Sequence, residues 1–589
     1  MKRQRKAIAL AAMVAAVSLT AAACGGGGSD DKSSSTNKAL GFDALTKGKV
    51  LNPSTKKGGT LKLMSPQDVD FMDPTRAYYG FVWDIQRLYV RQLLATDSKP
   101  GAAGNQLVPD LAAAMPEVSA DGKTYTFKLK DGIKFDDGTA ITSKDVKYGI
   151  ERQFAQDVLS GGPTYLINVL DQGQKYPGPY KDTDPDKLGL KSVQTPDDKT
   201  IVFKLKDANS DFPYMLAMGS ASPVPKAKDD GAKYNNHPVA SGPYKVESFT
   251  PGKGAVFVRN TNWDPKTDTI RTGLPDRIEF TPTTNPDDED SRLLSGSIDY
   301  DINGSGVQQA AKIKILQNQK LKANASNPHT GYIRYMVFPQ TVKPFDNIHC
   351  RKAVIYAAEP TSLQTARGGP TSGDLGANML PTGIAGSEGK SYDPYGLTDG
   401  KPDVAKAKEE LKACGKEGGF KTTIAVRNNR EPEVKTAESL QASLKAVGID
   451  AAIDQYDGKL SSSVIGAPDN VKKKNYGIIV MGWGADYQTG AGFLQALVDG
   501  RFILDNGNNN YSMLNDKTVN GLFDKAAAAK SPEEAGEFYK QINHNIMEKA
   551  LYLPINFDKA LVYVNPRLKN VFLSEGQGGR LDLAVVGVN

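Results

Sequence analysis

The sequence predicts an α/β fold, because strand-like and helix-like patterns alternate along most of the chain. Short alternating or apolar segments predict strands at 60–63, 125–129, 201–205, 256–258, 278–280, 332–337, 423–426, 477–480 and 560–564. Apolar residues at helical spacing predict helices at 143–154, 404–414 and 432–447. The chain has 58 glycines and 34 prolines, which predict many long surface loops between these elements.

The N-terminus has the layout of an export signal. A basic head at residues 1–6 precedes an uncharged, mostly apolar run at 7–19 and the small residues Ala21-Ala22-Ala23. As a helix, that run rises about 20 Å, which is too short for the ~30 Å hydrocarbon core of a bilayer. Cys24 follows directly and resembles the cysteine of a bacterial lipobox, although Ala21 stands where leucine is usual.

We therefore expect a lipoprotein signal peptide at 1–23 and a lipid on Cys24. Residues 24–54 would be the lipid anchor and a flexible tether, because the start of this segment is rich in glycine and polar residues. The alternative is an ordinary secretory signal that leaves a free cysteine. No second apolar stretch approaches a membrane span, so the lipid would be the only attachment to the membrane.

Removal of the signal changes the composition that matters for partners. Residues 1–23 hold four basic and no acidic residues, so their loss lowers the formal net charge from +6 to +2. A nearly neutral protein gives no reason to expect a nucleic-acid partner. The remaining cysteines, Cys350 and Cys414, are expected to form a disulfide outside the cytoplasm, the alternative being two free buried thiols. A mature chain of this length is enough for two to four domains.

The segment 135–152 is the most distinctive motif of the chain. It begins as a turn at Asp137-Gly138, after which Thr142 and Asp145 have the spacing of a helix capping box. The order of its residues resembles the signature of the bacterial extracellular solute-binding proteins of family 5, which bind peptides, dipeptides or nickel for ABC importers. The same resemblance continues, in order, through 58–63, 72–74, 107–112, 125–130, 241–245, 258–264, 295–299, 351–357 and 482–487, with Asn262 where an aromatic residue is usual.

This resemblance implies a two-lobed periplasmic-binding-protein-like fold (type II, cluster C) with an extra small domain inserted in lobe I. The implied ranges are 55–90, 200–280 and 553–589 for lobe I, 91–199 for the inserted domain and 281–552 for lobe II, with hinges near 275–285 and 548–556. It also implies a monomer without cofactor or metal, held by its lipid at the outer face of the cell membrane. There it would deliver peptides to an ABC permease and ATPase complex.

Within the resemblance, Asp486 corresponds to the aspartate that holds the ammonium group of a peptide. It lies in the motif Gly482-Trp-Gly-Ala-Asp-Tyr487, directly after a predicted strand. A carboxylate is suited to this role because a charge-assisted hydrogen bond can hold an ammonium group. The alternative is a helix-capping or hinge aspartate, and Gln488-Thr489-Gly490 departs from the turn that often follows in peptide binders.

The other candidate ligand-binding residues are Trp483, Gly482, Tyr487, Tyr78, Tyr79, Gly80, Tyr165 and Arg427. Gly80 would allow the ligand backbone to approach closely, and the tyrosines offer flat walls with a hydroxyl group. Arg427, and with it Arg430, follows a predicted strand and is a possible partner for the ligand carboxylate. The alternatives are core or surface tyrosines and solvated arginines.

The competing class is a secreted enzyme. Only four histidines are present, none of them in an HExxH pattern, and there is no G-x-S-x-G motif, so no catalytic residues are assigned. Two further hypotheses stay open: a binding protein for an oligosaccharide or another small solute, and a peptide-sensing receptor without transport.

Overall fold

The predicted alternation of strands and helices builds two large sheets and one smaller sheet in the computed structural model, which describes residues 40–588. The expected signal peptide, Cys24 and the start of the expected tether lie outside the described residues. Every predicted strand and helix overlaps an observed one. None of the helices within 40–588 combines the length and apolar character needed to cross a membrane.

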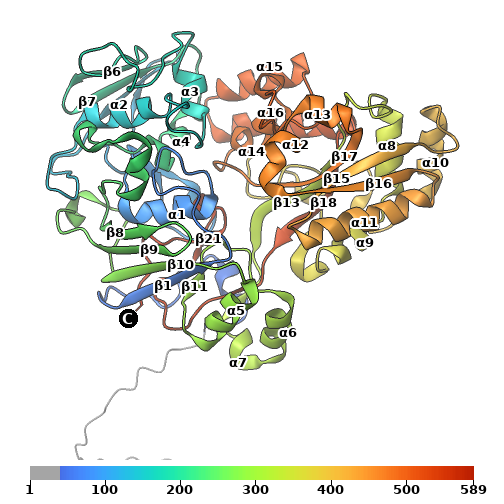
Figure 1. The fold of residues 1–589 in the computed structure, drawn as a ribbon, viewed down its shortest axis with the longest axis horizontal. Helices are drawn as coiled ribbons and strands as arrows, with labels where there is room; N and C mark the ends of the chain where they lie inside the picture. Colours follow the sequence, from blue (N-terminus) through green and yellow to red (C-terminus); the bar gives the residue numbers. More distant parts are fainter. Residues whose placement is uncertain (1–39, 589) are drawn as a thin grey trace, which may run out of the picture. The chain divides into compact units, whose positions relative to one another are not determined.

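The first large sheet has five strands in the order β11 (Tyr300–Asp301), β1 (Thr60–Ser65), β10 (Arg277–Pro282), β9 (Gly254–Arg259) and β8 (Tyr244–Thr250). Its buried residues share one apolar core with α1 (Gly80–Tyr89) and with residues near the C-terminus. We call this part lobe I (Figure 1).

The smaller sheet is antiparallel, with four strands in the order β4 (Glu117–Val118), β5 (Thr124–Lys128), β7 (Thr200–Lys204) and β6 (Val193–Asp197). With α2 (Ser143–Arg152), α3 (Tyr165–Leu170) and α4 (Phe212–Met215) it encloses a separate core, which we call the inserted domain. The capping box predicted at the start of α2 is confirmed. The side chain of Thr142 accepts from the backbone N–H of Asp145, and the side chain of Asp145 accepts from the backbone N–H of Thr142.

The second large sheet defines lobe II and has six strands. Their order is β14 (Gly373–Leu375), β18 (Tyr552–Lys559), β13 (His329–Val337), β17 (Tyr476–Trp483), β15 (Lys421–Arg427) and β16 (Asp450–Tyr456). Because side chains alternate along a strand, its buried residues divide between two cores, one on each face. One core includes α8 (Ile348–Ala357), α9 (Pro360–Ala366), α10 (Val404–Ala413) and α11 (Glu431–Lys445). The other face carries α12 (Ser461–Val464), α13 (Pro468–Lys473), α14 (Gly490–Val498), α15 (Lys517–Ala527) and α16 (Pro532–Glu548).

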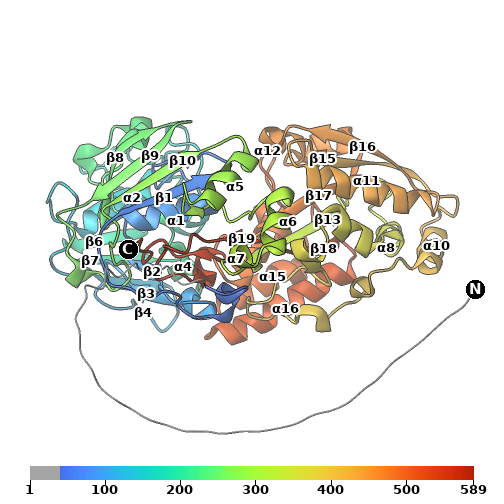
Figure 2. The ribbon, with the colours of Figure 1, turned by 90° about the horizontal axis from the view of Figure 1, so that it is seen from below.

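The chain crosses between the lobes along two segments that pair with each other as β12 (Ala325–Ser326) and β19 (Val562–Tyr563). A small core joins this pair to α5 (Pro286–Ser295) and α6 (Gln309–Gln317), with α7 (Gln319–Lys322) beside them (Figure 2). The remaining two-stranded pairs are β2 (Leu94–Thr96) with β3 (Leu107–Pro109), and β20 (Leu573–Ser574) with β21 (Arg580–Leu581).

These pairings differ from the ranges that the resemblance implied. β11 belongs to the sheet of lobe I although it lies after residue 281, and nearly all of β18 belongs to the sheet of lobe II although it lies after residue 552. β7 extends the inserted domain past residue 199, and the crossing lies at β12 and β19 rather than near 275–285 and 548–556. The reason is physical: sheet membership is fixed by long-range pairing, and a two-residue strand such as β11 leaves almost no local pattern.

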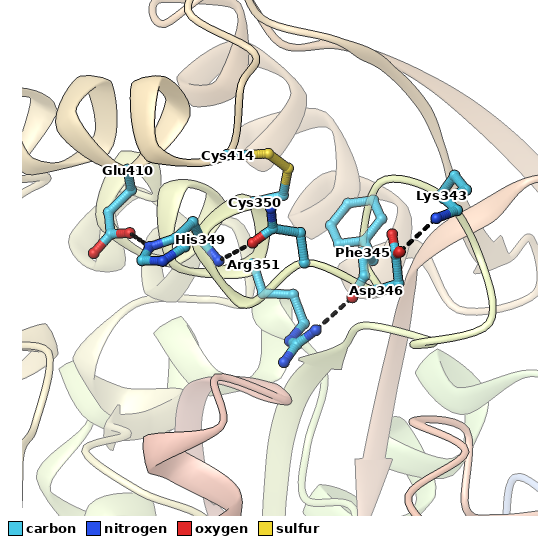
Figure 3. Close-up of a disulfide and its surroundings, with 9 residues drawn as sticks. Lys343, Phe345, Asp346, His349, Cys350, Arg351, Glu410 and Cys414 are labelled. Carbon is cyan, nitrogen blue, oxygen red and sulfur yellow. Dashed lines mark hydrogen bonds and ion pairs between the residues drawn. A yellow bond between two sulfur atoms is a disulfide. The ribbon is translucent and has the colours of Figure 1, made fainter.

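Cys350 of α8 and Cys414, directly after α10, are joined through their sulfur atoms, with their Cα atoms 5.3 Å apart (Figure 3). On the neighbouring position of α8, His349 Nδ1 lies 2.6 Å from a carboxylate oxygen of Glu410 on α10. Two side-chain links therefore tie α8 to α10.

A buried ion network joins lobe I to the inserted domain. Arg152, the last residue of α2, donates to both carboxylate oxygens of Asp73, at 3.0 and 2.8 Å, and to Asp229 at 3.1 Å. The side chains of all three residues are fully buried. Arg152 Nη1 also donates to the hydroxyl of Thr75, so one guanidinium fixes the loop that follows β1.

We expect Arg152→Met to lower the free energy of unfolding by about 3–5 kcal/mol, because it leaves Asp73 and Asp229 buried without a counter-charge. Urea unfolding followed by circular dichroism measures the change. Arg292→Met is the matched control: its ion pair with Asp288 is half exposed, so about 0–1 kcal/mol is expected. Equal losses in the two variants would show that the Arg152 network does not hold the domains together.

Candidate functional site

A cavity of about 650 Å³ lies between lobe I and lobe II. The lobe I residues on its wall include Tyr78, Tyr79, Gly80, Trp83 and Arg580. The lobe II residues include Tyr332, Arg334, Arg427, Arg430, Gly482, Trp483, Asp486, Tyr487 and Asp558. Of the predicted site residues, only Tyr165 is absent from this wall, and it contacts Asp486 instead. The structure therefore brings together side chains from distant parts of the sequence.

Asp486 of lobe II is hydrogen-bonded to one residue of lobe I and one residue of the inserted domain. The hydroxyl of Tyr78 donates to its Oδ2 atom at 2.7 Å, and the hydroxyl of Tyr165 donates to the same atom. Within residues 40–588, no hydrogen bond reaches its Oδ1 atom. Burial raises the pKa of Asp486 to about 6, while the hydrogen bonds from Tyr165 and Tyr78 act in the opposite direction.

Tyr78 is presented by a loop that its own backbone contacts hold in shape. The carboxylate of Asp70 accepts hydrogen bonds from the backbone N–H groups of Tyr78 and Tyr79, at 2.6 and 3.1 Å. The loop before Tyr165 packs against the same segment, since a Cβ atom on Gly162 would lie 2.2 Å from the carbonyl oxygen of Thr75. Gly162 also has a φ of +77°, which favours glycine. One packed loop pair therefore positions both tyrosines that meet Asp486.

Tyr487 contributes more to joining the lobes than to the cavity wall. Its ring lies 5.3 Å from that of Tyr165 and 6.2 Å from that of Tyr214, and its side chain belongs to the core of the inserted domain. Two residues later, the hydroxyl of Thr489 lies 3.0 Å from the buried carboxylate of Asp211. The segment after Asp486 thus anchors lobe II to the inserted domain.

Gly482 and Gly484 make room for side chains from the neighbouring strand. Gly482 faces Arg334 in the β13–β17 register, and a Cβ atom on Gly482 would lie 2.5 Å from Nη1 of Arg334. A Cβ atom on Gly484 would lie 3.0 Å from the ring of Tyr332. Between the two glycines, Trp483 lines the cavity, and its Nε1 atom is buried with no hydrogen-bond partner among the described residues.

The arginine side chains of the cavity wall differ in whether a carboxylate of the protein neutralises their charge. Arg427 is held by the carboxylate of Glu433 through a two-point contact, with Nε 2.8 Å from Oε2. Arg430 is exposed to the cavity, and no carboxylate of residues 40–588 lies within ion-pair distance of it. On the other wall, Arg580 packs against Gly80, where a Cβ atom would lie 3.0 Å from Nη2.

Arg334 and Arg580 were not among the residues predicted from the sequence. A signal for Arg334 was present, because it is the only charged residue in the otherwise buried or aromatic strand segment 332–337. Arg580 follows three glycines in 576–579, which gave no periodic pattern. No group of three or more histidine, cysteine, aspartate or glutamate side chains in the described part of the chain could hold a metal ion.

Comparisons with known proteins identify the family and the fold of the chain. Residues 106–503 match the family model described as bacterial extracellular solute-binding proteins, family 5, middle. The chain is 27% identical over 452 residues to the glutathione-binding protein GsiB of Escherichia coli O1:K1, covering 75% of this chain and 79% of the relative. Among solved structures, it resembles clavulanic acid biosynthesis oligopeptide binding protein 2 with 40% identity and a TM-score of 0.90, over 93% of this chain and 99% of that one. The Helicobacter pylori protein DppA, solved with the peptide STSA, shares the fold at 23% identity and a TM-score of 0.70, over 90% of this chain and 98% of that one.

We expect Gly482→Ala to lower the free energy of unfolding by about 1–3 kcal/mol, because the added methyl group displaces Arg334 from its contact with Asp558. Urea unfolding measures the loss. Gly521→Ala is the control, since Gly521 lies in α15 with open space around its Cα atom. That variant should be neutral or more stable by about 0.5–1 kcal/mol, as expected for alanine in a helix. A neutral Gly482→Ala would contradict the role assigned to the glycine.

Proposed function

Because the chain belongs to the bacterial extracellular solute-binding proteins of family 5, we propose that it captures peptides in the cavity between its lobes and delivers them to an ABC permease and ATPase complex. The observation that carries this proposal is the state of Asp486. Two carboxylates line the cavity among the described residues, and Asp558 contacts Arg334 while Asp486 has no basic partner. A half-buried carboxylate without a counter-charge is suited to a cationic group of the ligand.

The geometry at Asp486 fits the ammonium group of a free peptide N-terminus. An ionised carboxylate accepts several hydrogen bonds, and both tyrosine hydroxyls use the same oxygen atom, Oδ2. The other oxygen stays available for an N–H group of the ligand. A ligand held there would also touch lobe I and the inserted domain, because Tyr78 and Tyr165 come from those parts.

Other groups on the wall suit the rest of a peptide. The indole N–H of Trp483 is an unpaired donor for a backbone carbonyl group, and Arg430 is an uncompensated cation for the opposite end. The names of two relatives describe an oligopeptide-binding protein and a glutathione-binding protein, both of which take peptide ligands. We propose that the cargo is released chemically unaltered.

A binding assay with three classes of compound separates these hypotheses. Isothermal titration of the purified protein with free-amine peptides, N-acetylated peptides and oligosaccharides should give heat only with the first class. Binding of oligosaccharides alone would favour a sugar-binding protein. Turnover of any compound at catalytic protein concentrations would contradict a carrier.

We also propose that the mature protein is a monomer that begins at a lipid-modified Cys24 and carries a Cys350–Cys414 disulfide. The sequence motif supports the first modification, and the 5.3 Å separation of the Cα atoms supports the second. The intact mass of protein extracted from membranes should show loss of residues 1–23, a diacylated Cys24 and two hydrogen atoms fewer than the reduced chain. A soluble, unlipidated mature form would contradict the anchor, and a mass with both hydrogens present would contradict the disulfide.

We expect Asp486→Asn to weaken the binding of free-amine peptides by about 2–5 kcal/mol, because it removes one partner of a hydrogen-bonded charge pair formed on binding. Asp207→Asn is the matched control, since the Asp207 side chain is largely exposed and its nearest lysine nitrogen lies 4.0 Å away. Titration calorimetry measures both. If free-amine and N-acetylated peptides bind the unmodified protein equally well, Asp486 is not the ammonium site.

The same interaction predicts a pH dependence. The pKa of Asp486 is about 6 without ligand, and an ammonium group is held only by the ionised carboxylate. Affinity should therefore fall as the pH is lowered through 6, and Asp486→Asn should remove this dependence. The pKa values of Tyr78 and Tyr165 are raised well above their usual range by burial, so both hydroxyls keep their protons throughout.

A further inference from the structure

Four arginines of lobe II gather around only two carboxylates. The arginine cluster comprises Arg334 on β13, Arg367 after α9, Arg427 at the end of β15 and Arg430 before α11, and its carboxylates are Glu433 and Asp558. Arg334, Arg427, Arg430 and Asp558 line the cavity, while Arg367 lies beyond its wall.

Two of the four guanidinium groups are hydrogen-bonded to the two carboxylates, one to each. Arg427 takes both oxygens of Glu433, and Arg334 contacts Asp558 while its Nη1 atom lies 4.0 Å from Glu433. A second hydrogen-bond donor reaches Asp558, because the amide of Asn556 donates to Oδ1 at 2.7 Å. Among the described residues, no hydrogen bond joins either of the remaining two arginines to these carboxylates.

Arg367 and Arg430 carry the surplus charge. The side chain of Arg367 is 9% exposed, its Nε atom is 3.9 Å from Asp558, and both Nε and Nη1 are buried without a hydrogen bond among the described residues. Burial, followed by the charge of Arg334, lowers the pKa of Arg367 to about 10. Arg430 has no carboxylate within ion-pair distance in residues 40–588. The cluster therefore holds two positive charges more than its carboxylates neutralise.

Arg367 is buried without a full set of partners, which is costly, whereas Arg430 is exposed to the cavity. A negative charge bound beside Arg430 would compensate that cation directly and would act on Arg367 through the low-dielectric wall. One carboxylate would compensate only one of the two charges. Two carboxylates close together would supply a charge equal to the surplus, and the planar guanidinium groups on the cavity wall are suited to contact them with paired N–H donors.

We propose that the arginine cluster binds a ligand end that carries two carboxylates, and that the preferred cargo is a peptide whose last residue is aspartate or glutamate. This inference rests on the proposed function, because it assigns the end of the peptide opposite to the amine held by Asp486. The terminal carboxylate would contact the arginines on the cavity wall. The side-chain carboxylate would be the second negative charge, beside Arg430, which has no carboxylate of its own within ion-pair distance in residues 40–588.

The test compares two tripeptides of the same size, Ala-Ala-Glu and Ala-Ala-Gln, by titration calorimetry at low ionic strength and pH 7.5. We expect the glutamate peptide to bind the unmodified protein at least tenfold more tightly. In Arg430→Gln this preference should fall to threefold or less. Arg367→Gln is a second variant on the same cluster and should reduce the preference in the same direction.

Arg277→Gln is the matched control, because Arg277 lies on β10 outside the cavity and pairs with Glu247 and Glu279. It should keep the full preference, and circular dichroism checks that each variant is folded. Equal affinity for the two peptides in the unmodified protein, or a preference lost in Arg580→Gln and kept in Arg430→Gln, would overturn the two-carboxylate site while leaving the amine site intact. Absence of binding to either peptide would overturn this inference together with the proposed function.

Discussion

The contact between Arg152 and Asp73 is the interaction on which the geometry of the cavity depends. It is buried, it joins the last turn of α2 to the loop after β1, and it acts on the segment that leads to Tyr78. Gly162 packs against the same loop and precedes Tyr165 by three residues. Both tyrosines that reach Asp486 are therefore held by one rigid junction between lobe I and the inserted domain.

The cavity wall on lobe II follows a different constraint, which is the close approach of side chains to backbone. Arg334 and Tyr332 lie over Gly482 and Gly484 because the β13–β17 register places them there. The glycines of the motif that contains Asp486 thus have a packing role in addition to any contact with a ligand. This arrangement brings Arg334 of β13 to the same cavity wall as Asp486, which follows β17. A positive and a negative side chain therefore lie at different places on this wall.

The sequence was most informative where the determinant is local. Thr142 and Asp145 are three residues apart, and their capping box was predictable from that spacing alone. Asp486, Tyr78 and Tyr165 were chosen through a family resemblance, and the structure places them in contact. Arg334 was missed because its place in the wall depends on which residue of β17 it faces. The lobe ranges were displaced for the same reason, since β11 and β18 belong to their sheets through partners far away in sequence.

The hydrogen bonds at Asp486 show how one carboxylate can serve both the protein and a ligand. Tyr78 and Tyr165 use only Oδ2, so a cation at Oδ1 would add to these contacts rather than replace them. Each tyrosine stabilises the ionised form of Asp486 against the cost of burial, which keeps its pKa at about 6 rather than higher. The hydroxyl groups therefore help to keep the carboxylate ionised near neutral pH, so that it can bind a positive group. Since they come from lobe I and the inserted domain, these hydroxyl groups reach Asp486 only while those parts contact lobe II.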